Sequence, residues 1–171
     1  MSHPLICSIT TEQTATSTSD LAKQAAAKGA PSGSGFLAIE QTAGRGRRGR
    51  QWLSQKGGMY LSVVLRPTVK KKYWFALSFA ASLAALDTVR HQLARHFDDK
   101  HMPQTGLKWP NDVIVEGGKI AGILLEVEGQ SLIVGSGINI TTVPAKNEEA
   151  PHHQAIAPVA LADILPQPIE V

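Results

Sequence analysis

The stretch AGRGRRGR, residues 43–50, combines four arginines with three glycines and is the strongest candidate for chemistry in this sequence. Glycine lets the backbone turn so that its N–H groups can face an anion. Arginine adds a planar fork that donates two parallel hydrogen bonds to an oxyanion. A block of like charge is ordinarily a solvated loop. The alternative hypothesis is that residues 43–50 bind an anionic ligand.

Two other interpretations of this stretch were weighed. Residues 44–49 match the dinucleotide pattern G-x-G-x-x-G, but that pattern needs a helix directly afterwards, and RQWLSQKGG continues as a loop. The same arginines are similar to basic RNA-binding tracts. However, the tract is one short copy without interleaved aromatic residues, and the formal net charge of the chain is only +3. We therefore expect no nucleic-acid partner.

A second candidate is LKWPNDVIVEGGKIAGILLE, residues 107–126. Lys108 and Lys119 bracket a turn that presents Asn111 and Asp112, whose oxygen atoms suit a magnesium ion that accompanies a nucleotide. Taken alone, an ordinary turn with a solvated lysine is the simpler interpretation. Both interpretations remain open at this point.

A third candidate is GSGIN, residues 135–139, at the end of an apolar run. Gly135 and Gly137 permit close approach of a ligand or of another strand, and Asn139 offers both a donor and an acceptor. Packing explains the glycines equally well. Three clusters of glycine and polar residues, each joined to a strand, nevertheless favour one shared pocket.

The elements that must position these clusters follow from the hydrophobic pattern. Ser and Thr caps followed by helix formers predict a helix over 21–28, ended by Gly29. A short strand is expected at 36–40. Residues 41–58 have little periodicity and form a long functional or mobile loop, which leads to a strand over 59–66.

The principal helix is predicted over 74–97, because large apolar residues recur there at helical spacing. They are Phe79, Leu83, Leu86, Leu93 and Phe97. Strands at 112–116, 119–128 and 131–140 form an antiparallel meander. The expected class is α+β, with a mixed or largely antiparallel sheet and helices packed on one face. The Pro-rich tail, 144–171, carries a helical turn over 158–165 and is interpreted as an unfinished edge.

The composition limits the number of domains and the cellular setting that the sequence allows. The chain has 171 residues, a length typical of one domain, with 43% hydrophobic and 18% charged residues. Cys7 is the single cysteine, so no internal disulfide can form, and a reducing, cytoplasmic setting is expected. No export signal and no membrane segment are predicted.

Taken together, the motifs resemble those of the catalytic domain of biotin protein ligases, within the biotin/lipoate ligase superfamily. The matching stretches are QTAGRGRRGRQW, GGMYLSVVLRP, LKWPNDV, GGKIAGILLE and GSGIN, in family order and with family spacing from about residue 16 to 140. The resemblance implies a catalytic domain like that of class II aminoacyl-tRNA synthetases, spanning 1–171. The sequence departs from the usual family pattern in its domains, since we expect no N-terminal DNA-binding domain and no SH3-like C-terminal domain, the second of which the family normally has.

The resemblance further implies a two-step reaction. Biotin and MgATP give biotinyl-5′-adenylate and pyrophosphate, and a lysine of a biotin carboxyl carrier protein, part of a biotin-dependent carboxylase, then takes the biotin. A homodimer is compatible with this resemblance. Two alternatives stay open. One is a binding module for biotin or an acyl-adenylate that is catalytically weak or truncated. The other is a ligase or transferase that acts on lipoate or octanoate.

The site residues that the resemblance implies divide by role. Those for biotin are Ser17, Thr18, Gln41, Arg45, Gly46, Arg47, Lys119 and Gly122, with Lys119, Arg45 and Arg47 also catalytic. Those for ATP are Trp52, Lys108, Asn111, Asp112 and Asn139, with Asp112 as the magnesium ligand. The sequence departs from the family where DSTN is common, because residues 16–19 read TSTS.

Overall fold

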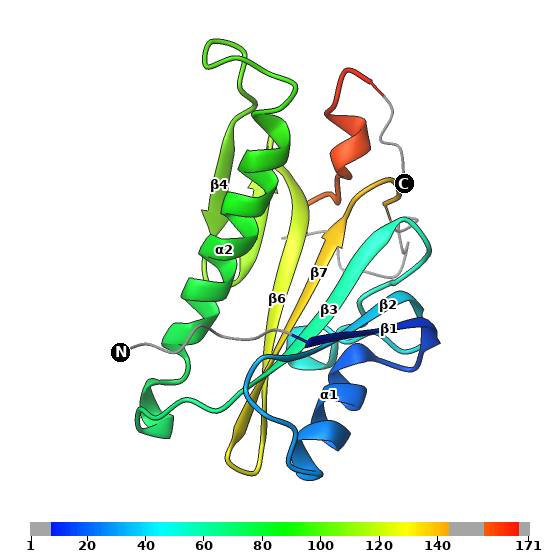
Figure 1. Ribbon diagram of the computed structural model, residues 1–171. Coiled ribbons are helices and arrows are strands. Elements are labelled where there is room, and N and C mark those ends of the chain that lie inside the picture. Colours follow the sequence, from blue (N-terminus) through cyan, green and yellow to red (C-terminus); the bar gives the residue numbers. More distant parts are fainter. Residues whose placement is uncertain (1–7, 144–155, 168–171) are drawn as a thin grey trace.

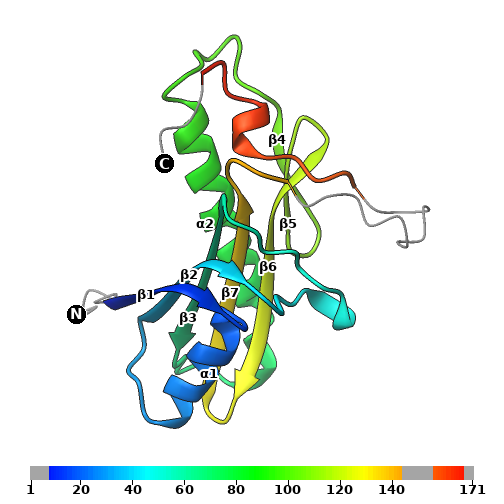
Figure 2. The ribbon, with the colours of Figure 1, turned by 90° about the vertical axis from the view of Figure 1, so that its right-hand side faces the viewer.

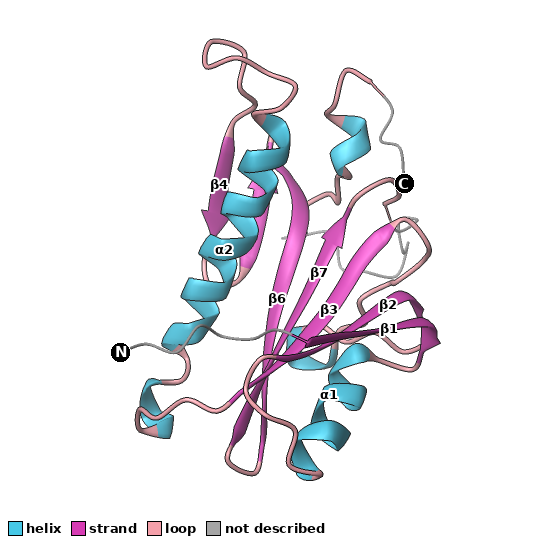
Figure 3. Ribbon diagram, viewed as in Figure 1, coloured by secondary structure: helices cyan, strands magenta, loops and turns pink. Residues whose placement is uncertain are grey.

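The computed structural model describes residues 8–143 and 156–167, which are built around one seven-stranded sheet (Figure 1). The order across the sheet is β1-β2-β3-β7-β6-β5-β4 (Figure 3). The strands are β1 (Ser8–Ala15), β2 (Ser34–Gln41), β3 (Gly58–Leu65), β4 (Thr105–Lys108), β5 (Asp112–Val115), β6 (Gly118–Glu128) and β7 (Ser131–Asn139). The helices are α1 (Thr18–Ala27) and α2 (Ala76–Leu93), with short 3₁₀ turns at Arg47–Gly49, Lys71–Tyr73 and Leu161–Asp163. Cys7 lies outside the described residues.

The sheet is antiparallel throughout, except that β1 pairs with β2 in parallel. Tight turns produce this pattern, because Gly117 and Gly129 adopt φ values of 76° and 55° between consecutive strands. Glycine reaches this region without the steric cost that a Cβ brings. The predicted α+β class, the largely antiparallel sheet and the strands of the meander are confirmed.

Strand β1 was not predicted from the sequence. Of its eight residues only Ala15 is buried, so neither face shows the apolar alternation that marks a half-buried strand. The strand forms because its backbone pairs with β2, from Ser8 opposite Ser34 to Ala15 opposite Gln41. This pairing joins segments that are far apart in the sequence, so no local pattern announces it.

The two helices cover opposite faces of the sheet (Figure 2). Ile133 of β7 packs with α1, whereas the next residue, Val134, packs with the cluster that includes α2. Successive side chains of a strand point to opposite faces, so these contacts place the helices on different sides. The prediction that the helices share one face is therefore wrong. The central strands are apolar on both sides, and both sides need a cover.

The buried side of α2 also differs from the predicted stripe. Its buried residues are Ser82, Ala85, Leu86, Val89 and Leu93. Leu83, which was assigned to the stripe, is 50% exposed. Leu86 and Leu93 are buried as predicted, and the smaller Ser82 and Ala85 belong to the same contact, although the predicted stripe did not include them. None of the described helices has the length and apolar character needed to cross a membrane.

Residues 156–167 pack against the end of β6. The amide of Lys119 donates to Ala157 O at 2.8 Å, and Val159 N donates to Lys119 O at 3.0 Å. Leu161 is buried in the same core as α2, in a 3₁₀ turn where a helical turn was predicted. The interpretation of the tail as an unfinished edge is wrong for this segment.

The position of the α2 contact can be tested with two matched substitutions. Leu93 is fully buried, so Leu93→Ala should lower the free energy of unfolding by about 2–5 kcal/mol. Leu83→Ala removes the same atoms from a half-exposed position and should cost less than about 1 kcal/mol. Urea unfolding followed by circular dichroism measures both. Equal losses would contradict the helix orientation.

Candidate functional site

The indole of Trp52 lies directly on the sheet, on the face that also carries α1. Gly122 of β6 and Gly137 of β7 are register partners, and the indole covers both. A Cβ on Gly137 would lie 2.5 Å from Trp52 Nε1, and one on Gly122 would lie 2.9 Å from its ring. The paired glycines therefore make a flat floor for a planar group. Trp52 Nε1 is buried without a hydrogen-bond partner among the described residues.

The loop that carries Trp52 is folded back on itself. Gln41 N donates to Ser54 O at 2.9 Å, Trp52 N donates to Gly44 O at 2.9 Å, and Gly46 N donates to Arg50 O at 2.7 Å. The predicted loop is thus a hairpin-like projection whose two sides are joined by backbone hydrogen bonds. Two of its arginines, Arg45 and Arg47, contact different parts of the fold.

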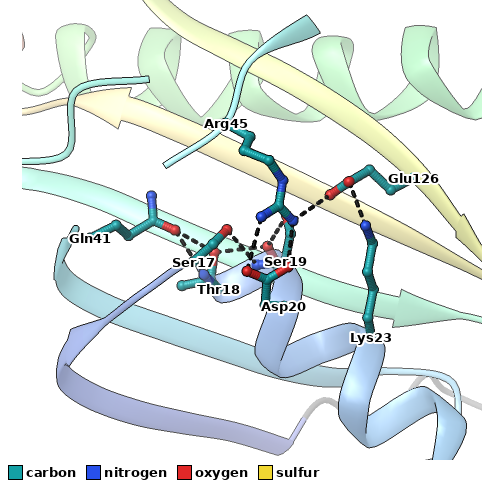
Figure 4. Close-up of polar contacts among 9 residues, drawn as sticks. Ser17, Thr18, Ser19, Asp20, Lys23, Gln41, Arg45 and Glu126 are labelled. Carbon is teal, nitrogen blue, oxygen red and sulfur yellow. Dashed lines mark hydrogen bonds and ion pairs between the residues drawn. The ribbon is translucent and has the colours of Figure 1, made fainter. Parts of the chain in front are cut away.

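Arg45 points toward α1 and β6, where it meets two carboxylates (Figure 4). Its guanidinium donates to both oxygens of Asp20, at 2.9 and 2.7 Å, and to Glu126 Oε2 at 3.3 Å. Lys23 Nζ lies 2.6 Å from Glu126 Oε1 and completes a cluster of four charges. Arg45 therefore anchors the loop to the helix and to the sheet.

These contacts shift the pKa values of Asp20, Glu126 and Arg45. The hydrogen bond from Arg45 lowers the pKa of Asp20, against a smaller opposing effect of burial. Burial by itself raises the pKa of Glu126, but the hydrogen bond from Lys23 and the charge of Arg45 together leave that pKa below its usual value. The hydrogen bond to Asp20 raises the pKa of Arg45. Asp20, Glu126 and Arg45 are therefore all charged at neutral pH.

Arg47 points away from this cluster, toward the turn before β5. Its Nη1 donates to Asn111 Oδ1 at 2.8 Å. Asn111 is held in turn by Ile123 of β6, because its side chain donates to Ile123 O at 2.8 Å and its carbonyl accepts from Ile123 N at 2.9 Å. Among the described residues, no carboxylate lies within ion-pair distance of Arg47. Unlike Arg45, it therefore keeps a charge that no carboxylate balances.

Lys119 lies between Trp52 and β5. Its Nζ is 2.7 Å from Asp112 Oδ1, an ion pair that does not have hydrogen-bond geometry, and 5.1 Å from the centre of the Trp52 ring. Its Cε also lies within 3.3 Å of the position that a Cβ on Gly122 would occupy. The ammonium group thus sits at the rim of the glycine floor, with one carboxylate as its counter-charge.

The N-terminus of α1 forms a buried polar corner beside this face (Figure 4). Ser17 caps the helix and accepts a hydrogen bond from Ser19 N. Gln41 Oε1 accepts from Thr18 N at 2.8 Å and from Thr18 Oγ1 at 3.1 Å. Ser17 and Thr18 are 2% and 3% exposed, so the corner is nearly closed to solvent. A ligand that reaches it must make hydrogen bonds there.

The structure brings together most of the predicted site residues, in three groups. One is the polar corner, one is Trp52 with Lys119 and Gly122, and one is Arg47 with Asn111 and Asp112. Lys108 lies exposed on β4, and Asn139 is buried, where its amide donates to Val159 O at 3.1 Å and to Lys119 O at 3.4 Å. The nucleotide roles of Lys108 and Asn139 stay predictions.

Four residues of this region were given no role by sequence reasoning, namely Asp20, Lys23, Ser54 and Glu126. Glu126 carried a signal, because it is a carboxylate between apolar neighbours in a strand and such a group needs a partner when it is buried. The other three are polar residues in a helix and a loop, where they are common. Only the fold shows which of them face Arg45 and Gln41.

A shallow hollow of about 350 Å³ lies on the other side of the loop. It is lined by Glu40, Gln41, Thr42, Gln51, Leu53, Ser54, Gln55 and Lys56. It shares only Gln41 with the predicted site, and the cation in its lining, Lys56, is not one of the predicted site residues. We place the chemistry on the glycine floor instead, because Lys119, Arg47 and Arg45 border that floor.

The charge cluster gives a prediction about pH. Because Asp20 and Glu126 have lowered pKa values in the folded protein, they add stability above their unfolded pKa values of about 4 and lose it as pH falls through the folded values. Asp20→Asn should therefore destabilise the protein at pH 7, and the difference from the wild type should shrink below about pH 4. Urea unfolding at several pH values measures it. A difference that does not vary with pH would contradict the cluster.

The glycine floor gives a second prediction. Gly137→Ala places a methyl group where the Trp52 indole lies, so the indole should move into solvent and its emission should shift to the red. The measurement uses a Trp74→Phe/Trp109→Phe background, in which Trp52 is the single tryptophan. Gly106→Ala is the control, because a Cβ there meets nothing within 4 Å. An unchanged spectrum for Gly137→Ala would place the indole elsewhere.

Comparison with known proteins agrees with this geometry. The biotin–[acetyl-CoA-carboxylase] ligase of Mycobacterium tuberculosis is 43% identical over 136 residues, which are 77% of this chain and 48% of that protein. The chain thus spans about half the length of this relative.

Solved structures give the same result. The biotin protein ligase of Leishmania major, in complex with biotinyl-5-AMP, aligns with 91% of this chain and 64% of its own at a TM-score of 0.75 and 30% identity. The biotin protein ligase of Aquifex aeolicus, in complex with biotin and ATP, aligns with 95% of this chain and 62% of its own at a TM-score of 0.73 and 29% identity. Residues 8–142 match the model of the biotin/lipoate A/B protein ligase family. The chain belongs to this family.

Proposed function

We propose that this chain activates biotin with ATP and transfers it to a lysine of a carrier protein, as a biotin–protein ligase. The observation that carries the proposal is the arrangement on the α1 face of the sheet. A buried polar corner, a glycine floor under Trp52 and the cations Arg47 and Lys119 lie along one path. A ligand with a polar head, an apolar chain and an anionic end fits this sequence of environments.

In the first step, a carboxylate oxygen of biotin attacks the α-phosphorus of ATP. The new C–O–P linkage forms as the bond from the α-phosphorus to its bridging oxygen breaks, and pyrophosphate leaves. The reaction brings anions together, so its main requirement is positive charge placed beside the developing charge. No nucleophilic side chain is needed.

Lys119 and Arg47 are suited to this task for different reasons. Lys119 is at the rim of the floor, where the biotin chain would end, and its ion pair with Asp112 holds it in place. Arg47 is held by a neutral amide, so its charge is not already compensated. Arg45 is bonded to two carboxylates, so its main role is to hold the loop in place and not to bind the ligand.

Asp112 fits a magnesium ion that accompanies ATP. The part of the chain that the structure describes has no cluster of three or more acidic, histidine or cysteine side chains that could hold a metal alone. Magnesium often takes one carboxylate and completes its shell with phosphate oxygens and water, so a single aspartate suffices. When bound, the ion supplies charge neutralisation at the phosphates.

In the second step, the amine of a carrier lysine attacks the acyl carbon of the adenylate. An amide C–N bond forms, the C–O bond to AMP breaks, and the amine loses a proton to solvent. The acetyl-CoA carboxylase named with the Mycobacterium relative suggests the carrier, a biotin carboxyl carrier protein. We propose that residues 8–142 make up the catalytic domain of such an enzyme, in a cytoplasmic setting.

The direct experiment incubates the chain with biotin, MgATP and a biotin carrier domain, and reads the acceptor lysine by mass spectrometry. Biotin-dependent exchange of pyrophosphate into ATP tests the first step alone. Both signals support the proposal. Bound biotin with neither exchange nor transfer would replace the enzyme by a binding module, and exchange with lipoate or octanoate instead would change the substrate.

The loop gives a prediction of its own. Arg47→Gly removes the uncompensated charge that would hold the adenylate, so the activated acyl group should escape and label bystander proteins. Biotin on lysines of added serum albumin should rise by about tenfold, a loss of about 1.4 kcal/mol in retention. Arg48→Gly is the matched control, because Arg48 is exposed in the same turn. Unchanged retention in Arg47→Gly would contradict this role.

A further inference from the structure

A chain of side-chain hydrogen bonds connects α1, β3 and the loop. It passes through Ser19, Ser62, Thr18, Gln41 and Ser54 and ends at Trp52 O. Its separations are 3.2, 2.8, 3.1, 2.7 and 3.0 Å in that order. Ser54 lies where this chain leaves the polar corner and enters the loop.

The direction of every bond follows from the last group. A carbonyl oxygen can only accept, so the Ser54 hydroxyl must donate to Trp52 O. Ser54 Oγ then accepts from Gln41 Nε2 at 2.7 Å, which turns Gln41 Oε1 toward the N–H of Thr18. Ser54 and Thr18 thus fix the two ends of the Gln41 amide.

Ser54 has little freedom to choose another partner. Its side chain is 6% exposed, and its backbone carbonyl is bonded to Gln41 N. A Cβ on Gly44 would lie 2.4 Å from both Ser54 Oγ and Trp52 O, so the two segments cross in close contact. The Ser54 hydroxyl is the acceptor for Gln41 Nε2 at this crossing. Removing it would leave Gln41 Nε2 without its present partner.

The polar corner therefore offers a ligand a specific unused group. Gln41 Oε1 already accepts two hydrogen bonds, whereas Nε2 has two hydrogens and donates only one to Ser54. The second N–H of Gln41 Nε2 is free to donate to a ligand, and the carbonyl oxygen of a cyclic urea is a strong acceptor. A site built to bond such a group discriminates against an analogue that lacks it.

We propose that Ser54 is a positioning residue that holds the Gln41 amide so that its free N–H meets the ureido oxygen of biotin. Ser54 thereby sets the preference for a ureido carbonyl without contacting the ligand. This inference rests on the proposed function, since it takes biotin as the ligand. It adds a residue that lies outside the glycine–arginine motif and joins the polar corner to the carbonyl of Trp52.

The test compares biotin with 2-iminobiotin, in which an imino group replaces the ureido oxygen, by titration calorimetry. Ser54→Ala should weaken biotin binding about tenfold and change iminobiotin binding little, so the preference between them falls. Ser34→Ala is the matched control, because Ser34 is also buried and donates to Pro31 O at 2.9 Å. It should leave the preference unchanged. ATP affinity should be unaltered in both variants.

A double-mutant cycle shows whether Ser54 acts through Gln41. In a Gln41→Leu background, Ser54→Ala should have no further effect on biotin affinity, because the group that it positions is gone. Additive effects would overturn the proposal, and so would an equal loss of affinity for both ligands. If the wild type binds neither ligand, the proposed function fails and this inference falls with it. If the wild type binds biotin and Ser54→Ala keeps the full preference, only this inference fails.

Discussion

The guanidinium of Arg45, shared between Asp20 and Glu126, is the contact on which the rest of the site depends. It ties the loop after β2 to α1 on one side and to β6 on the other. Together with the backbone hydrogen bonds within the loop, this tie holds Trp52 over the glycines of β6 and β7. The charges are partly exposed, so the value of the cluster lies in fixing geometry more than in adding stability.

The cations around the floor differ in what balances them, and that difference suggests a division of labour. Arg45 has two carboxylates, Lys119 has one, and Arg47 has the amide of Asn111. An anionic ligand gains most from a positioned charge that nothing else neutralises. The loop therefore contains, two residues apart, an arginine that two carboxylates hold and one that we propose meets the ligand.

Much of the fold could be predicted because its rules are local. Glycine turns and apolar runs marked β5, β6 and β7, and the Ser and Thr caps marked α1. Strand β1 could not be found, since its exposed residues carry no alternation and its partner is distant in the chain. In α2 the predicted stripe was right for Leu86 and Leu93, which are buried, and wrong for Leu83, which is half exposed.

The sequence by itself determined the chemistry: arginines beside glycines, a lysine after a tight turn and an aspartate before it are properties of residue type and spacing. Only the tertiary structure decided which of these groups meet. Arg45 of the loop is 25 positions from Asp20 and 81 positions from Glu126 in the sequence. Their pairing depends on the order of strands in the sheet, because that order, and no local preference, brings β6 beside the end of α1.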